Sequence, residues 1–269
     1  MACAVRLTLD PAAEPALGEA LGELLASWSV RGGELAVWVG EGDAEAASAL
    51  LAAAGLEVRG REVEPERDWV AEAAALQRPV AVAGIFLEPH DPPTVDAWGL
   101  RRLLLPAERA FGTGSHESTR LALRLLLGAV RPGDAVLDVG CGAGTLALAA
   151  RIAGAGGCLG FDLDLDAPFV ARRNALRNGV GRCAFWAGLL GSLSPAARFD
   201  LVAANMLQEE VGPLVPDLAA LLRPGGLLVT AGQLASREEE FLGLLARAGL
   251  RPSRLAVEGE WLGTLSERV

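Results

Sequence analysis

The feature that most constrains this chain is a glycine-rich turn within residues 135–150. The apolar run Ala-Val-Leu-Asp-Val leads into Gly-Cys-Gly-Ala-Gly and then directly into Thr-Leu-Ala-Leu-Ala-Ala. This pattern predicts a buried strand that turns through Gly140, Gly142 and Gly144 into a helix. Missing side chains at such a turn let a ligand approach the backbone and the amino end of the helix. Because a tight turn needs glycine for its geometry alone, the glycines by themselves do not establish a ligand site.

Strand and helix patterns alternate along the rest of this half of the chain. The predicted strands are 135–139, 158–161, 183–186, 201–204 and 227–230, and the predicted helices between and after them are 145–152, 167–178, 209–222 and 237–248. Such alternation is typical of a mostly parallel, doubly wound α/β sheet of the Rossmann-like kind. Ligands of these sheets bind beyond the carboxyl ends of the strands, where the glycine turn lies.

Two acids flank the glycine turn in positions that favour a nucleotide ligand. Asp162 closes the second predicted strand, 20 residues after Gly142, where an acid can accept both ribose hydroxyls. Asp138 stands two residues before Gly140, where it can engage the amino-acid end of S-adenosylmethionine, a role without a counterpart in the dinucleotide pattern. The pattern resembles the class I methyltransferases, and a dinucleotide-binding fold is the alternative.

The first 65 residues show a different alternation. Their apolar patterns predict strands at 5–9, 34–39 and 56–63 and helices at 14–27 and 44–54. An alternation of this size fits a small α+β domain of the ferredoxin-like kind. No functional motif lies within it.

Two further segments resemble the PrmA family, bacterial methyltransferases of a ribosomal protein at the base of the large-subunit stalk. They are Phe-Gly-Thr-Gly-Ser-His-Glu-Ser-Thr-Arg at 111–120 and Phe-Asp-Leu-Val-Ala-Ala-Asn at 199–205. The resemblance is specific from 111 to about 259. It implies a ferredoxin-like domain for substrate recognition over 1–65, a linker over 66–105 and a methyltransferase domain over 106–269.

The resemblance also implies functional residues. Thr119, Gly140, Asp162 and Asn205 fall at the family's S-adenosylmethionine-binding positions. The loop at 111–114 is implied to fold over the methionine end of the cofactor, and its Phe111 and Thr113 are counted among the cofactor-binding candidates with Asp138, Gly142 and Gly144. Alternatively, Ser115 or Thr113 caps the amino end of the helix that follows, and both interpretations can hold at once.

Asn205 and His116 are the catalytic candidates. Asn205 stands where many amine methyltransferases place the group that accepts hydrogen bonds from the nucleophilic nitrogen, although an asparagine after a strand is also a common turn residue. Methyl transfer from a sulfonium is an in-line displacement, so alignment of a neutral amine matters more than a strong base. His116 could relay a proton or simply pack beside the loop.

The chain departs from the family pattern upstream of the methyltransferase core. Residues 105–109 read Leu-Pro-Ala-Glu-Arg where the family has an acid followed by Pro-Gly-Met, and Ser118 replaces the first of two threonines. A second tryptophan expected after Asp68 and Trp69 is replaced within the alanines at 73–75. These changes lie where the substrate, rather than the cofactor, would be met.

The formal charge of −10 belongs entirely to the first third of the chain. Residues 1–95 carry 16 acids and 6 arginines, whereas residues 96–269 carry 18 of each sign. A nucleic-acid-binding protein would show the opposite asymmetry, so no direct contact with nucleic acid is expected. An acidic domain attracts a basic partner such as a ribosomal protein, although a merely solubilising surface would have the same composition.

The remaining composition argues against other classes. Four scattered cysteines and two histidines suggest neither a metal site nor a disulfide framework. The chain contains no long apolar segment, which predicts a cytoplasmic protein without membrane contact.

Three functions are compatible with the sequence. The first is an S-adenosylmethionine-dependent protein N-methyltransferase that modifies lysine ε-amines or the N-terminal α-amine of a ribosomal protein. The second is an enzyme of the same fold that acts on another protein or a small amine. The third is a non-catalytic module that keeps the cofactor pocket.

Overall fold

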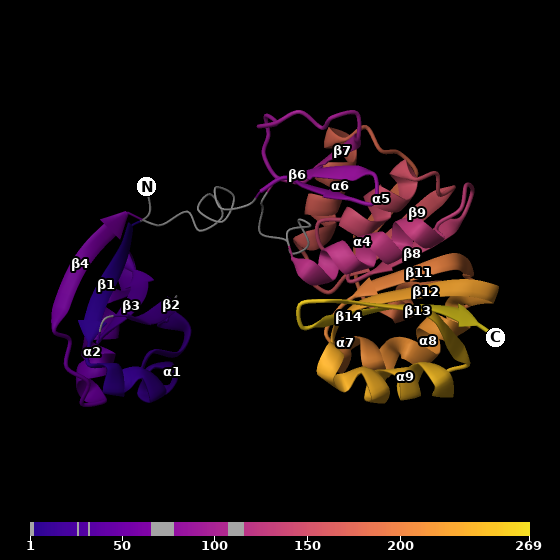
Figure 1. Ribbon diagram of the computed structural model, residues 1–269. Helices are drawn as coiled ribbons and strands as arrows, with labels where there is room; N and C mark the ends of the chain where they lie inside the picture. The colour runs from indigo at the N-terminus through magenta and orange to yellow at the C-terminus, as the bar shows by residue number, and fades with distance from the viewer. Residues whose placement is uncertain (1–2, 26, 32, 66–77, 107–115) are drawn as a thin grey trace. The chain divides into compact units, whose positions relative to one another are not determined.

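The computed structural model describes residues 3–25, 27–31, 33–65, 78–106 and 116–269. The chain divides into two compact units between residues 72 and 73 (Figure 1). Each unit has its own apolar core. Within the described residues, no helix is both long enough and apolar enough to span a membrane.

The N-terminal unit is a four-stranded antiparallel sheet with helices on one face. Its elements are β1 (Cys3–Leu9), α1 (Leu17–Leu21), β2 (Ser27–Arg31), β3 (Glu34–Gly40), α2 (Ala44–Ala53) and β4 (Gly60–Pro65), and the strand order is β2-β3-β1-β4. Val5, Leu7 and Leu9 are fully buried, and the residues between them lie on the opposite face. This βαββαβ arrangement confirms the predicted ferredoxin-like domain.

The helix predicted over 14–27 is wrong in its extent. Pro15 lies within a 3-10 turn at Pro11–Ala16, and α1 stops at its C-cap Gly22, which has a positive φ of 53°. Both residues interrupt a regular helix, so the chain is free to form β2, which was not predicted from the sequence. The last strand begins at Gly60, four residues later than predicted.

Much of the segment expected to be a linker is ordered. Three short strands, β5 (Val80–Val82), β6 (Ile85–Glu88) and β7 (Arg101–Leu104), form a sheet in that order within the C-terminal unit. Leu103 and Leu105 are fully buried. The Asn178 side chain donates to the carbonyl of Leu104 at 2.8 Å and accepts from its N–H at 2.7 Å. These contacts attach the small sheet to the body of the unit.

The large sheet of the C-terminal unit has seven strands in the order β10-β9-β8-β11-β12-β14-β13. Five are parallel, as predicted: β8 (Ala135–Val139), β9 (Gly157–Asp162), β10 (Cys183–Ala187), β11 (Phe199–Asn205) and β12 (Leu222–Leu234). β13 (Leu250–Glu258) and β14 (Trp261–Arg268) form an antiparallel hairpin that pairs with β12. Neither hairpin strand was predicted from the sequence.

Helices cover both faces of this sheet (Figure 1). On one face lie α4 (Glu117–Ala129), α5 (Thr145–Ile152) and α6 (Ala167–Arg177), and on the other lie α7 (Gln208–Val211), α8 (Val215–Leu221) and α9 (Glu238–Arg247). The single helix predicted over 209–222 is divided by a 3-10 turn at Gly212–Leu214 that contains a proline. The predicted Rossmann-like fold is confirmed, and it brings the ends of β8, β9 and β11 to one edge.

Candidate functional site

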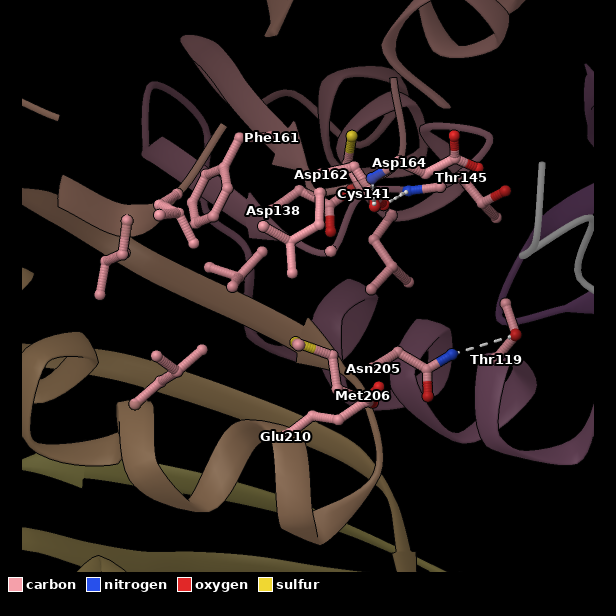
Figure 2. Close-up of a pocket in the computed structure, with 18 residues that line it drawn as sticks. Thr119, Asp138, Cys141, Thr145, Phe161, Asp162, Asp164, Asn205, Met206 and Glu210 are labelled. Atoms are coloured by element: carbon pink, nitrogen blue, oxygen red, sulfur yellow. Dashed lines mark hydrogen bonds between the residues drawn. The ribbon is translucent and has the colours of Figure 1, made fainter. Parts of the chain in front are cut away.

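A cavity of about 620 Å³ opens at the carboxyl ends of β8, β9 and β11 (Figure 2). Its size is in the range of sites for small ligands and cofactors. The residues that line it are Thr119, Asp138, Val139, Gly140, Cys141, Gly142, Thr145, Leu146, Phe161, Asp162, Leu163, Asp164, Leu189, Leu190, Asn205, Met206, Glu210 and Leu214. Six of the sequence-predicted residues therefore meet in one place.

The glycine turn forms the rim of the cavity beside β8. Gly140 and Gly144 both have positive φ angles, 66° and 80°. A Cβ on Gly144 would lie 2.9 Å from the Cβ of Ala171, so α6 packs where a side chain would stand. Gly144 caps α5 and supports the turn from behind, whereas Gly140 and Gly142 face the cavity.

Asp138 holds the first turn of α5 against β8. Its side chain is 1% exposed, and Oδ2 accepts a hydrogen bond from the Ala147 N–H at 3.0 Å. Burial raises the pKa of this carboxyl to about 7, the Ala147 bond opposes the rise and the charge of Asp162 adds to it. Near neutral pH, Asp138 therefore gains or loses a proton readily, and a cation beside it favours the ionised form.

Asp162 joins the glycine turn to the end of β9. Its Oδ2 accepts from the Gly142 N–H at 2.8 Å, and its Oδ1 accepts from the Asp164 N–H at 3.0 Å. A carboxylate has about four lone-pair sites, so each oxygen can accept a further hydrogen bond from a ligand hydroxyl. Apolar side chains of Phe161, Leu189 and Leu190 lie in the same cavity.

Asn205 lies at the end of β11, next to α4. Its Nδ2 donates to Thr119 Oγ1 at 3.1 Å, and Figure 2 shows the amide nitrogen turned toward Thr119. The Thr119 side chain is buried, which fixes the amide orientation. The carboxamide oxygen is thereby left as an acceptor at the cavity.

The lining is acidic. Four carboxyl groups, those of Asp138, Asp162, Asp164 and Glu210, line the cavity, and no arginine is among the described lining residues. A dinucleotide carries an anionic pyrophosphate, which such a lining disfavours, whereas a ligand with cationic groups is attracted. The electrostatics thus favour S-adenosylmethionine over a dinucleotide.

Three other predicted site residues, Phe111, Thr113 and His116, are not among the described residues that line the cavity. Phe111 and Thr113 are outside the described residues. His116 is the N-cap of α4, where its Nδ1 accepts from the Ser118 N–H at 3.3 Å. Its ring meets Trp261 edge-on at a centroid separation of 5.1 Å. His116 is not among the described residues that line the cavity, and its catalytic role stays a prediction.

Several lining residues were missed from the sequence. Leu189 and Leu190 follow β10, and Met206 and Glu210 follow Asn205. Their positions just after strand ends were a usable signal, because all parallel strands end at the same edge.

The comparison with known families identifies the chain's relationship. The sequence pattern of the family described as "Ribosomal protein L11 methyltransferase (PrmA)" matches residues 41–268, most of the chain. The chain belongs to this family. The match includes every cavity residue and the strands β13 and β14.

Curated relatives carry the same description. The protein from Thermus thermophilus is 44% identical over 160 residues, which cover 60% of this chain and 62% of the relative. The protein from Chloroflexus aurantiacus is 40% identical over 190 residues, covering 62% and 58%, and that from Burkholderia multivorans is 40% identical over 190 residues, covering 70% and 61%. The chain thus spans about three fifths of the length of these relatives.

A solved structure agrees with the fold. The crystal structure described as ribosomal protein L11 methylase from Lactobacillus delbrueckii subsp. bulgaricus superposes with a TM-score of 0.65 at 28% identity. The superposition covers 71% of this chain and 99% of that one.

Proposed function

We propose that this protein transfers methyl groups from S-adenosylmethionine to amino groups of ribosomal protein L11, on lysine ε-amines, the N-terminal α-amine or both. The observation that carries the proposal is the cavity of a PrmA family member in which the glycine turn, Asp162 and Asn205 meet at one sheet edge. The chain's own residues fit the cofactor and the acceptor at separate places in that cavity.

The cofactor fits the acidic, half-apolar lining. The Asp162 carboxylate would accept from the ribose hydroxyls, and Phe161, Leu189 and Leu190 would give the adenine an apolar surface. Asp138 and the backbone at Gly140 would serve the amino-acid end, where the ionised carboxylate would pair with the ligand's ammonium. When bound, S-adenosylmethionine supplies an activated methyl group on a cationic sulfur.

Asn205 orients the acceptor. Its carboxamide oxygen accepts a hydrogen bond from an N–H of the incoming neutral amine, which points the nitrogen lone pair away from Asn205. Thr119 holds the amide by its nitrogen, so the oxygen is presented in one orientation. As the nitrogen–carbon bond forms, the carbon–sulfur bond of the cofactor would break and sulfur would keep its electron pair. The methylated ammonium would then lose a proton to solvent, so no strong base is required.

The N-terminal unit is proposed to attract the basic substrate. Glu34 and Glu62 flank Arg6 at 3.9 and 3.4 Å, and their side chains are 64% and 69% exposed. Two carboxylates around one guanidinium leave a local net negative charge, which would steer a basic protein by long-range attraction. The reaction would take place in the cytoplasm, where ribosomal proteins are synthesised.

Labelled S-adenosylmethionine tests the proposal. The protein is incubated with the purified ribosomal protein and, separately, with a lysate depleted of ribosomes, and Asn205→Ala serves as the matched control. Label on the ribosomal protein supports the proposal, whereas label only in the depleted lysate indicates another protein or a small amine as acceptor. Cofactor binding without turnover on either would indicate a binding module.

A further inference from the structure

Strand β12, which lies beside the end of β11 that carries Asn205, is irregular near the site. β12 pairs with β11 so that Ala231 faces Asn205, and along β14 the register shifts between Ala231 and Gln233. Gly232 is the extra residue of this β-bulge. Bulges bend a strand locally and often re-aim nearby groups beside active sites.

Gly232 brings the bulge into contact with the loop that carries Asn205. Its φ is +91°, a backbone conformation that residues with a Cβ rarely adopt. A Cβ here would lie 2.7 Å from the Met206 carbonyl oxygen and 3.2 Å from Asn205 Oδ1. The absence of a side chain at 232 is therefore what allows the Asn205 oxygen and the next carbonyl to occupy their positions.

Gln233 fixes the same loop by hydrogen bonds. The side chain is 0% exposed, and Nε2 donates to the Met206 carbonyl at 2.9 Å and to the Ala231 carbonyl at 3.0 Å. The Met206 N–H donates to the same Ala231 carbonyl at 3.0 Å. Both sides of the Met206 residue are thus tied to the bulge.

The choice of glutamine is not explained by packing. Gln233 Oε1 is buried and has no hydrogen-bond partner among the described residues. An unpaired buried acceptor is unfavourable, so an apolar side chain would serve better if the position only filled space. The hydrogen bonds that Nε2 donates are therefore what favours glutamine at this position.

We propose that Gly232 and Gln233 are positioning residues that set the Asn205 carboxamide for the acceptor amine. The inference rests on the proposed function, since it assigns the bulge a role in the same transfer. Thr119 fixes the amide nitrogen of Asn205, and the bulge holds the backbone of the next residue, Met206, and leaves space for the Asn205 oxygen. A small displacement of the group that aligns the acceptor amine slows methyl transfer, and it leaves the affinity for the cofactor unchanged.

Three variants of the full chain test the inference, with the ribosomal protein as acceptor. Gln233→Met keeps the length and removes the donor, Gln233→Glu replaces the donor by a carboxylate, and Gly232→Ala adds the obstructing Cβ. Thr230→Val is the matched control, because Thr230 is buried in the same strand and bonds Thr264 at 2.8 Å, away from Met206. Calorimetry gives the cofactor Kd, thermal unfolding gives Tm, and initial rates give kcat and KM.

We expect kcat to fall on the order of 10- to 100-fold in Gln233→Met and Gly232→Ala, while the cofactor Kd stays within about threefold. Thr230→Val should lower Tm comparably and leave kcat within about twofold. The kcat of Gln233→Glu relative to the unmodified chain should rise as pH falls, because a buried carboxyl that takes up a proton becomes a donor again.

The outcomes separate the two proposals. If the unmodified chain methylates the ribosomal protein and all three variants keep kcat within about twofold, the positioning role is wrong and the proposed function stands. The positioning role is also wrong if Thr230→Val loses as much kcat as the other variants for the same decrease in Tm. Without methylation by the unmodified chain, the proposed function itself fails.

Discussion

The two units of the chain differ in what they bury. Among the described side chains of the N-terminal unit, only apolar ones are buried, whereas the C-terminal unit buries Thr119, Asp138, Asn174 and Gln233 among others. Buried polar groups are unfavourable unless they are paired, so they persist where a fixed geometry is needed. The contrast is compatible with the proposed division, in which the C-terminal unit would hold the reacting groups and the N-terminal unit would present charge to the protein substrate.

This division predicts different kinetic effects for changes in the two units. Substitutions at the cavity should alter kcat, cofactor Kd or stability. Substitutions on the N-terminal surface should alter only the KM for the protein substrate, because they change the encounter and leave the reacting groups in place.

Removal of the Asn205 carboxamide is expected to have the largest effect. Asn205→Ala should lower kcat on the order of 100-fold, since the acceptor amine loses the group that aligns it. The Asp162 contacts with the glycine turn remain, so calorimetry should find the cofactor Kd changed by less than about tenfold. A kcat within a few-fold of the unmodified chain would remove Asn205 from the reaction.

A side chain at Gly144 should destabilise the C-terminal unit. In Gly144→Ala the new Cβ would meet Ala171 at 2.9 Å in a backbone with φ of 80°, and we expect a loss of about 1–3 kcal/mol in the free energy of unfolding. Gly181→Ala is the control, because no atom beyond its two neighbours in the chain lies within 4 Å of its Cβ position. Equal denaturation midpoints for the two variants would contradict the tight turn.

Cofactor binding should depend on pH through Asp138. Since the pKa of this carboxyl is raised to about 7, the affinity for the cationic cofactor should fall as pH drops below about 7. Asp138→Asn should flatten this dependence, as measured by calorimetry from about pH 5.5 to 7.5. An unchanged pH profile in the variant would assign the dependence to another group.

The contribution of Asp138 to the stability of the unliganded protein should change with pH in the direction opposite to cofactor affinity. The folded state keeps a proton that the unfolded state releases above the ordinary aspartate pKa of 3.8. The stabilisation from this group is therefore complete at low pH and is lost as pH rises toward about 7. The difference in unfolding free energy between the unmodified chain and Asp138→Asn should change in that direction across this range.

Changes on the N-terminal surface should have the smallest effect. The double variant Glu34→Gln, Glu62→Gln should raise KM for the ribosomal protein by about two- to fivefold at low salt, and the effect should vanish at high salt. Both kcat and the cofactor Kd should stay constant, which steady-state kinetics at several salt concentrations can check. A change in kcat would break the division between the units.

Sequence patterns predicted the parts of the fold that depend on residues close together in the chain. The β8 turn, α5 and the five parallel strands follow from apolar periodicity and glycine punctuation, and the prediction of α5 matches its bounds in the structure. In contrast, β2 was not predicted, because its start falls in a segment whose alanines and leucines favour a helix. Pro15 and Gly22 interrupt that helix earlier than those residues suggested. The hairpin β13–β14 depends on pairing with β12, which no local pattern records.

The candidate site was predictable where residues lie at the carboxyl ends of strands in a recognisable motif. Asp138, Asp162 and Asn205 were found in this way. The bulge at Gly232 and Gln233 was not, since its importance lies in contacts with Met206, distant in sequence. His116 was assigned to the site from its neighbours along the chain; in the structure it caps α4 and meets Trp261, and its catalytic role stays a prediction.

Calorimetric titration of the full chain with S-adenosylmethionine asks whether the cavity at the ends of β8, β9 and β11 is the cofactor site. We predict one site per chain and a Kd that rises roughly 10- to 100-fold in Asp162→Ala, since hydrogen bonds to an ionised group are lost. Asp200→Asn, at the opposite end of β11, should bind as the unmodified chain does. Absent binding, or equal affinity in Asp162→Ala, would contradict this assignment of the cavity.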